Sequence, residues 1–280
     1  MGKVSDTHSA GSLVLMIGTG GLCYVIRPSD GAKLIAGRCH LETAGNGSVS
    51  LRDLNSAVYG IDEGSRCIAG DYDSVTCCVD TERYMLLPPQ LADEAAASDL
   101  AASLWPADDI AVEIAPVDGS SCSIAFAMPK DMASYLRRTF PEIKFCHRLN
   151  PIINALLKGT SCDCRRKACC FISAKGDHAD YAVAIDGSLA LAGSSAIRTM
   201  SDAVYFVEAA FDGNTPDDRV QRPESVVFLS SSPKDFINFK TVASGADPAM
   251  SVVPLLSMSP DIGGDISSDG LPQSLKLLIS

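Results

Sequence analysis

The densest group of reactive side chains is a set of four cysteines in one short stretch. Cys162 and Cys164 flank Asp163, and Cys169 and Cys170 follow a basic triplet. A zinc site needs four ligands, and its thiol pairs are usually separated by about two to four residues, a spacing that both pairs lack. Basic neighbours would lower the thiol pKa values and favour metal binding or oxidation. Because Cys169 and Cys170 begin an apolar strand, we expect one thiol on each face. A zinc or thiol sensor stays as an alternative function.

The histidines and serines show no hydrolase pattern. No histidine belongs to a metalloprotease pair, and there is no Gly-x-Ser-x-Gly elbow for a catalytic triad. His178 lies beside Asp177 and near Asp180 in a predicted turn, so it is a candidate for a polar site or simply part of a surface turn. His147 precedes a predicted helix, and we expect it to be structural.

A glycine-rich stretch after the first apolar run resembles a dinucleotide-binding fingerprint. It consists of Gly18, Thr19, Gly20 and Gly21. That fingerprint requires a helix directly after the glycines. An apolar run that reads as a strand follows here, so the sequence predicts a tight hairpin turn instead.

The composition of the 280 residues indicates a globular protein. Apolar residues make up 46% and charged residues 20%, and the formal net charge is −11. An acidic chain with a single Trp is a poor candidate for nucleic-acid or anionic-membrane binding. No apolar run approaches the roughly 18 residues that span a membrane. Residues 1–11 contain no hydrophobic segment, so we expect no secretory signal and read the 11 cysteines as reduced thiols in the cytoplasm.

Hairpin and helix signals divide the first half of the chain. Apolar runs separated by Gly and Asp-Gly turns predict a three-stranded antiparallel meander. Helical spacing predicts helices at residues 51–59, 93–105 and 129–140. The predicted strands of this half are residues 13–18, 22–26, 33–36, 74–79, 83–87, 110–116 and 122–128.

The second half repeats this order of strands and helices. A helix from Asn150 to Gly159 is followed by predicted strands at residues 169–173, 181–185 and 189–192. Asp202 is expected to cap the next helix, where packing accounts for Tyr205. A strand at residues 225–229 and a helix from Ser232 follow, and residues 275–279 are expected to form an edge strand or a docked tail.

An internal match supports a repeat. A shift of 156 residues places Asp30-Gly31 on Asp186-Gly187 and Gly37 on Gly193. Asp-Gly is frequent in hairpins, so chance also explains part of this match. The alternative is two copies of a meander with helices, each an α/β layer structure, with a cleft between them.

This arrangement resembles the actin-like ATPase fold. More closely, the chain resembles a bacterial family known as domain of unknown function 3822. The resemblance runs over most of the chain and rests on fold residues rather than a catalytic signature. The matching stretches are RYMLLPP at 83–89, MP at 128–129 with the helix to 141, residues 146–157 and 181–187, and TMSDAVYF at 199–206. The resemblance implies two ribonuclease-H-like βββαβα halves, residues 1–147 and 148–280.

The superfamily holds ATP at three turns, and the first of them matches in part. A strand ends in an acidic residue followed by Gly and Thr, which organise Mg²⁺ and cradle phosphate. The resemblance places Gly18 to Gly21 there, but the acidic position is Met16, which cannot organise a hydrated cation.

The other two turns are further from the pattern. In the second, Ser173 replaces the acidic residue, and the remaining candidates are Lys175, Gly176 and Asp177. In the third, a Gly-Gly turn that lets adenosine approach bare backbone is replaced by Ser230, Ser231 and Ser232. These turns together form a vestigial nucleotide site.

The leading hypothesis is therefore a degenerate pseudo-ATPase that serves as a binding or scaffold module, with no catalytic residues, metal or cofactor expected. The alternative is an ATP- and Mg²⁺-dependent ATPase or phosphotransferase that uses displaced acids such as Asp177. The expected partner is an unknown protein, and a homodimer stays open because actin-like relatives often self-associate.

Overall fold

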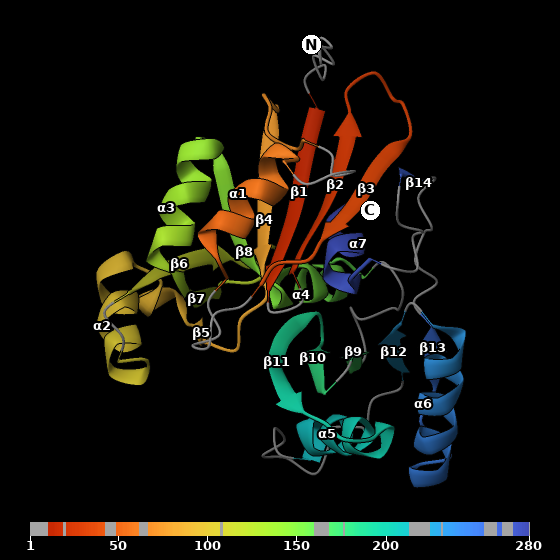
Figure 1. The fold of residues 1–280 in the computed structure, drawn as a ribbon. Coiled ribbons are helices and arrows are strands. Elements are labelled where there is room, and N and C mark those ends of the chain that lie inside the picture. The colour runs from red at the N-terminus through yellow and green to blue at the C-terminus, as the bar shows by residue number, and fades with distance from the viewer. Residues whose placement is uncertain are drawn as a thin grey trace.

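The structure is a computed structural model that describes residues 11–18, 21–42, 49–61, 67–106, 109–159, 168–175, 177–212, 225–230, 232–254, 262–264 and 271–279. Figure 1 shows two sheets, one above the other, with a smaller sheet at one side of the upper one. Within the described part of the chain, no helix has the length and apolarity needed to cross a membrane.

The first sheet contains the predicted meander. Its strand order is β14-β3-β2-β1-β4-β8, in which β1, β2 and β3 pair antiparallel and the other pairs are parallel. The strands are β1 (Gly11–Gly18), β2 (Gly21–Pro28), β3 (Leu34–Cys39), β4 (Ser74–Val79), β8 (Ile143–His147) and β14 (Ile262–Gly264). The strand directly after the Gly18 turn confirms the hairpin and excludes a dinucleotide fingerprint.

The second sheet has the equivalent order, β11-β10-β9-β12-β13. Its strands are β9 (Cys169–Lys175), β10 (His178–Ile185), β11 (Ser188–Ala196), β12 (Ser225–Leu229) and β13 (Val252–Pro254). Asp186 and Gly187 form the β10–β11 turn and both have positive φ, as a two-residue hairpin of this type requires. The predicted mixed α/β fold with two repeated meanders is confirmed.

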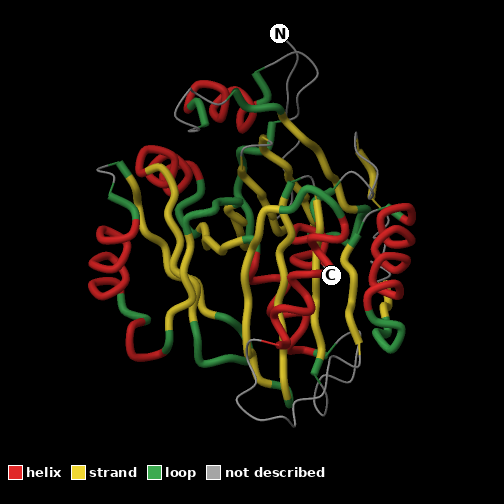
Figure 2. The backbone as a smooth tube through the Cα atoms, turned by 90° about the horizontal axis from the view of Figure 1, so that it is seen from below, coloured by secondary structure: helices red, strands yellow, loops and turns green. Residues whose placement is uncertain are grey.

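Helices cover both faces of both sheets (Figures 1 and 2). The first sheet packs on α1 and α3 on one side and on α7 on the other, while the second packs on α4 and on α5 and α6. The helices α4 and α7 also contact each other between the sheets. Their bounds are α1 (Leu51–Tyr59), α3 (Lys130–Thr139), α4 (Leu149–Lys158), α5 (Met200–Asp212), α6 (Pro233–Ala246) and α7 (Gln273–Ile279).

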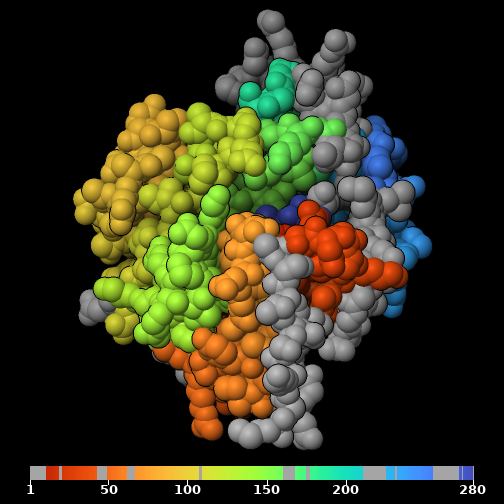
Figure 3. All heavy atoms as spheres, turned by 90° about the horizontal axis from the view of Figure 1, so that it is seen from above, coloured from red at the N-terminus to blue at the C-terminus, as the bar shows by residue number. Residues whose placement is uncertain are grey.

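An additional unit interrupts the first half between β4 and α3, which is a departure from the simple repeat. The hairpin predicted from the strands at residues 110–116 and 122–128 is confirmed. It joins a third strand in a separate sheet of order β5-β7-β6, and one helix packs on this sheet. Its elements are β5 (Tyr84–Leu87), the 3-10 helix η1 (Pro89–Leu91), α2 (Glu94–Leu104), β6 (Ile110–Pro116) and β7 (Ser123–Pro129). In Figure 3 this unit, in yellow, forms one flank of the molecule beside α3.

Local signals set most element ends. Ser50 caps α1 by accepting the Asp53 N–H, and Gly60 ends it with a φ of 61°. Pro129 is the N-cap of α3 rather than its first residue. Of the two expectations for residues 275–279, the docked tail is confirmed and the edge strand is wrong, because this segment lies in α7 and its apolar face, including Leu275, packs against β1. Docking decides this, since so short an apolar run is compatible with either structure.

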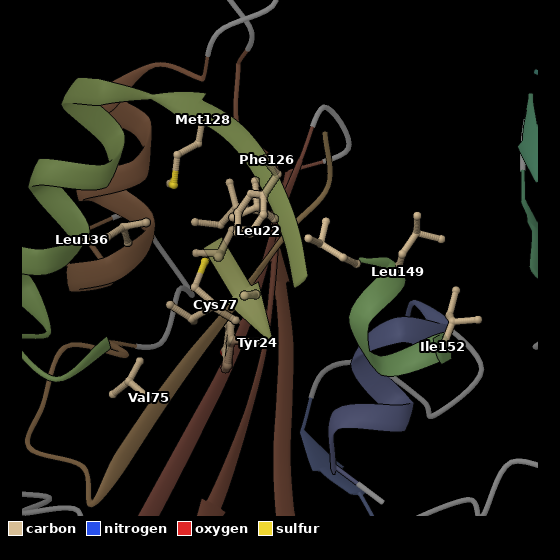
Figure 4. Close-up of a cluster of buried hydrophobic side chains, with 14 of the residues drawn as sticks. Leu22, Tyr24, Val75, Cys77, Phe126, Met128, Leu136, Leu149 and Ile152 are labelled. Atoms are coloured by element: carbon tan, nitrogen blue, oxygen red, sulfur yellow. The ribbon is translucent and has the colours of Figure 1, made fainter. Parts of the chain in front are cut away.

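Period-2 alternation distributes the strand residues between the layers. On β1, Leu15 faces α1 and α3, whereas Met16 faces α7. Cys77 likewise points into the core beside Tyr24 and Phe126 (Figure 4). Strands covered on both faces become continuous apolar runs, which explains their strong signal in the sequence.

Each meander also contains one tyrosine opposite a glycine. Tyr24 on β2 pairs with Gly37 on β3, and Tyr181 on β10 pairs with Gly193 on β11. A Cβ at Gly37 would overlap the ring of Tyr24, and a Cβ at Gly193 would lie 3.0 Å from the Tyr181 hydroxyl. The two glycines that matched in the sequence therefore accommodate equivalent rings, which supports the repeat independently of the Asp-Gly turns.

The substitution Gly37→Ala should lower the free energy of unfolding by about 1–3 kcal/mol, because the buried Tyr24 ring cannot move aside. Gly193→Ala should cost less, since the half-buried Tyr181 can shift. Gly245→Ala is the matched control, because it lies in α6 with no atom within 4 Å, and it should be neutral or stabilising. Urea unfolding measures all three, and an unchanged midpoint for Gly37→Ala would contradict the ring contact.

Candidate functional site

The first predicted turn lies at the end of the central strand. Gly18 ends β1 and pairs with Gly21 at the start of β2, where φ is 110°. Thr19 and Gly20 lie outside the described residues. A Cβ at Gly18 would lie 2.6 Å from Cβ of Asp80, whose backbone N–H donates to the Ile17 carbonyl at 2.8 Å. Gly18 is therefore packed against an acidic residue that follows β4.

The second turn connects β9 to β10. Lys175 ends β9, Gly176 lies outside the described residues, and Asp177 follows with a side chain that is 99% exposed. The Asp177 carboxylate lies 3.4 Å from Nδ1 of His178. The structure therefore places Asp177 in solvent beside His178.

The third turn begins a helix. The Ser230 hydroxyl accepts the Ser232 N–H at 2.9 Å, and the Ser232 hydroxyl accepts the Asp235 N–H at 3.4 Å. Ser231 lies outside the described residues. The two described hydroxyls thus cap α6 and its preceding turn. Among the described residues, no hydrogen bond or ion pair joins the three turns to one another.

A buried arginine lies where the two halves meet. Arg148 follows β8, immediately before α4, and is 1% exposed. Its guanidinium forms ion pairs with carboxylates from both halves, and we refer to these four residues as the arginine cluster. The pairs are Nη1 to Asp80 at 2.6 Å, Nη2 to Glu82 at 2.7 Å and Nε to Asp180 at 3.0 Å.

The remaining N–H groups of Arg148 are also used. Nη1 donates to the Thr81 carbonyl at 2.9 Å, and Nη2 donates to the Ser194 hydroxyl at 2.8 Å. A guanidinium has five N–H donors, so every donor of this side chain has an acceptor within the protein. Such a saturated arginine has no donor left for a bound phosphate.

Strand register explains how the cluster assembles. β4 and β8 are parallel neighbours with Val79 opposite His147, so the next residues, Asp80 and Arg148, leave the sheet side by side. In the second sheet, Asp180 on β10 lies opposite Ser194 on β11. The cluster therefore joins the carboxyl ends of β4 and β8 in the first sheet to β10 and β11 in the second.

The carboxylates differ in their surroundings. Side-chain exposure is 7% for Asp180, 27% for Asp80 and 67% for Glu82. Burial raises the pKa of Asp180 and outweighs the opposing attraction of Arg148. Burial alone would lower the pKa of Arg148, but the three carboxylates raise it, so the guanidinium stays charged. The fixed charge of Arg148 is what allows Asp180 to remain in the interior.

Two rings extend the cluster to the additional unit. Tyr84 on β5 stacks on His147 with ring centroids 4.5 Å apart, and its hydroxyl hydrogen-bonds the Ser194 backbone. Burial raises the pKa of Tyr84 to about 12. The His147 ring contacts the Thr81 carbonyl through Nε2 at 2.9 Å, while Nδ1 accepts the Leu149 N–H at 3.3 Å. A neutral ring with its proton on Nε2 satisfies both bonds, which fits the structural role predicted for His147.

Sequence reasoning missed most of this cluster. Asp80 and Glu82 follow a strand and Arg148 precedes a helix, but their positions show no characteristic spacing. Asp180 was noticed only as a neighbour of His178. The available signal is that a charged residue directly follows each of two apolar strands, Asp80 after β4 and Arg148 after β8. This signal places the two charges side by side only once β4 and β8 are known to be parallel neighbours.

The thiol hypothesis is only partly within the described residues. Cys162 and Cys164 lie outside them. Cys169 and Cys170 are buried and face different core clusters, as the alternation predicts. The expected lowering of thiol pKa values is wrong for Cys170, because burial raises its pKa. Within the described part of the chain, no three His, Cys, Asp or Glu side chains are arranged to hold a metal.

The start of α5 confirms one expectation and corrects another. Asp202 accepts the Arg198 N–H at 2.7 Å and the Thr199 N–H at 2.8 Å and so caps the helix, and these two bonds lower its pKa. Tyr205, by contrast, is 63% exposed, and its ring meets the Phe206 ring edge-on with centroids 5.5 Å apart. Packing therefore does not account for Tyr205, because the helix turns this position toward solvent.

The two meanders with their equivalent strand orders define an actin-like ATPase fold. A solved protein from Bacteroides thetaiotaomicron, described as having an actin-like ATPase fold and unknown function, is similar with a TM-score of 0.69, 16% identity, and coverage of 90% of this chain and 94% of the other. A structure of the type IV pilus biogenesis complex PilM–PilN has a TM-score of 0.47 and 11% identity, with coverage of 91% of this chain and 90% of the other. The AlfA filament from a B. subtilis plasmid has a TM-score of 0.44 and 10% identity, with coverage of 96% of this chain and 98% of the other.

The family model for the protein of unknown function DUF3822 matches residues 5–213, and this chain belongs to that family. A search of curated proteins found no match. The resemblance read from the sequence is therefore confirmed, both for the family and for the fold.

Replacing Arg148 with Met should lower the free energy of unfolding by about 3–5 kcal/mol, because a buried Asp180 would lose its counter-charge. Lys158→Met removes an exposed pair with Asp118, at 3.6 Å, and should cost at most about 1 kcal/mol. Both values come from urea unfolding at neutral pH. Equal effects of the two substitutions would contradict a central role for the arginine cluster.

Protonation of His147 should destabilise the protein at acidic pH. Burial lowers its pKa from the usual 6.5 to about 3 in the folded state, so between these values only the unfolded chain binds the proton. Stability should therefore be complete above pH 6.5 and fall by about 1.4 kcal/mol per pH unit below it. His147→Gln can retain a donor and an acceptor without titrating, and its stability should change with a smaller slope between pH 5 and 6.5. An identical slope in the variant would contradict this assignment.

Proposed function

We propose that this protein is a non-catalytic actin-like module that binds a protein partner. The observation that carries the proposal is the saturation of Arg148 by the protein's own carboxylates. An actin-like enzyme places phosphate and metal between its two halves. Here an internal ion-pair network occupies the junction between the two sheets.

The two strand positions at which an actin-like ATPase has an acidic residue support the same proposal. Met16 faces the apolar cluster under α7 that contains Val14 and Leu275. Ser173 lies opposite Asp180, whose charge is already engaged by Arg148. Neither position supplies an acid that could organise Mg²⁺.

One contact favours the alternative of an ATP-dependent enzyme. The Asp80 carboxylate lies against Gly18, with Oδ2 3.0 Å from the site of a Cβ there. In an enzyme, this carboxylate would be the displaced acid at the first turn, in place of the solvent-exposed Asp177. The alternative requires Asp80 to leave Arg148 when nucleotide binds.

The other expectations belong to the same proposal. We place the protein in the cytoplasm of a bacterium and divide it into ribonuclease-H-like halves at residues 147 and 148. The partner is a protein, with a second copy of this chain as one form of it. The zinc or thiol sensor stays a hypothesis for the loop that contains Cys162 and Cys164.

Millimolar Mg²⁺-ATP should leave the thermal midpoint unchanged relative to Mg²⁺ alone, because the arginine cluster needs no ligand. By contrast, nucleotide at about 100 times its dissociation constant would add about 2.7 kcal/mol to the stability of a competent binder. Differential scanning fluorimetry makes the comparison, with Gly18→Val as the variant that narrows the first turn.

A midpoint shift that disappears in Gly18→Val would overturn the non-catalytic proposal. ATP hydrolysis that is lost in Asp80→Asn would establish the alternative enzyme. A shift that persists in Gly18→Val would indicate nucleotide binding elsewhere on the protein and would leave the junction between the halves as described.

A further inference from the structure

Two cysteines form an in-register pair on the face of the first sheet that α7 covers. Cys78 on β4 lies directly opposite Cys146 on β8, and both belong to the cluster packed under α7. The Cys78 thiol interacts with the Cys146 thiol, and this interaction raises the pKa of Cys78. Both cysteines are free thiols.

The backbone geometry suits a covalent bond between them. Neighbouring strands lie about 4.8 Å apart. Disulfides join residues whose Cα atoms are about 4.4–6.8 Å apart and whose side chains point the same way. Cys78 and Cys146 are register partners on neighbouring parallel strands and share one face, so the pair meets both conditions.

The two thiols differ in access. Cys78 is completely buried, whereas Cys146 is partly exposed and lies on β8, at the edge of the sheet. The neighbouring Cys146 thiol and burial both raise the pKa of Cys78, so this thiol stays protonated. An oxidant would therefore meet Cys146 first, with Cys78 in place to react second.

We propose that Cys78 and Cys146 are a redox-active dithiol that hydroperoxides convert to a disulfide. The Cys146 sulfur attacks one peroxide oxygen, the O–O bond breaks, and the departing oxygen leaves as water or alcohol, giving a sulfenic acid. The Cys78 sulfur then attacks the Cys146 sulfur, the S–O bond breaks, and the oxygen leaves as water with the Cys78 proton. Two thiols lose two electrons and the peroxide gains them, and a small thiol such as glutathione reverses the change by exchange.

The position of the pair gives the modification a consequence. Two residues further along the same strands are Asp80 and Arg148, which form the shortest ion pair of the arginine cluster. A bond between Cys78 and Cys146 ties β4 to β8 directly below that ion pair. Oxidation thus restrains the strands that carry the junction between the halves.

The test uses the whole chain, treated with one equivalent of hydrogen peroxide, then unfolded and alkylated with N-ethylmaleimide. Non-reducing peptide mapping by mass spectrometry should give one cross-linked peptide pair that contains Cys78 and Cys146, and dithiothreitol should separate it. Cys77→Ala is the matched control, because Cys77 is buried next to Cys78 but faces the opposite core, and it should leave the cross-link intact. Cys146→Ser should abolish it.

The outcome on the wild-type protein decides the proposal even if a variant folds poorly. Recovery of both cysteines as alkylated thiols would overturn it. So would over-oxidation of Cys146 without a cross-link, or a disulfide from Cys78 to any other cysteine.

Discussion

The charge of Arg148 is the constraint on which the arrangement of the two halves depends. Its guanidinium binds Asp80 and Glu82 from the first half and Asp180 from the second. Moving these charges out of water carries a desolvation cost that offsets much of their attraction, so the cluster adds little net stability relative to an apolar contact. Its value lies in geometry, because an arginine with five satisfied donors fixes one relative position of its acceptors.

The additional unit is tied to the same point. Tyr84 stacks on His147 and reaches the Ser194 backbone, so β5 contacts both halves through a single side chain. The His147 ring, held neutral by burial, hydrogen-bonds the Thr81 carbonyl and accepts the Leu149 N–H. Three parts of the molecule thus converge at Arg148 and His147.

Much of the fold could be predicted from the sequence, because the strands are covered on both faces. Alternation then yields continuous apolar runs, and turns such as Asp186-Gly187 mark their ends. The predictions were weaker where docking decides the structure. The segment at 275–279 is helical because its apolar face packs on β1, and the unit inserted after β4 became visible only as a separate sheet.

The sequence by itself determined the two meanders, the matching glycines Gly37 and Gly193, and the absence of acids at Met16 and Ser173, because each follows from local residue type and order. Only the tertiary structure decided what occupies the junction between the halves. Arg148 is far from its carboxylates in sequence, and the pairing of parallel strands β4 and β8 brings it beside Asp80. Parallel strands such as β4 and β8 are joined by a long crossover connection, so no local turn fixes their register.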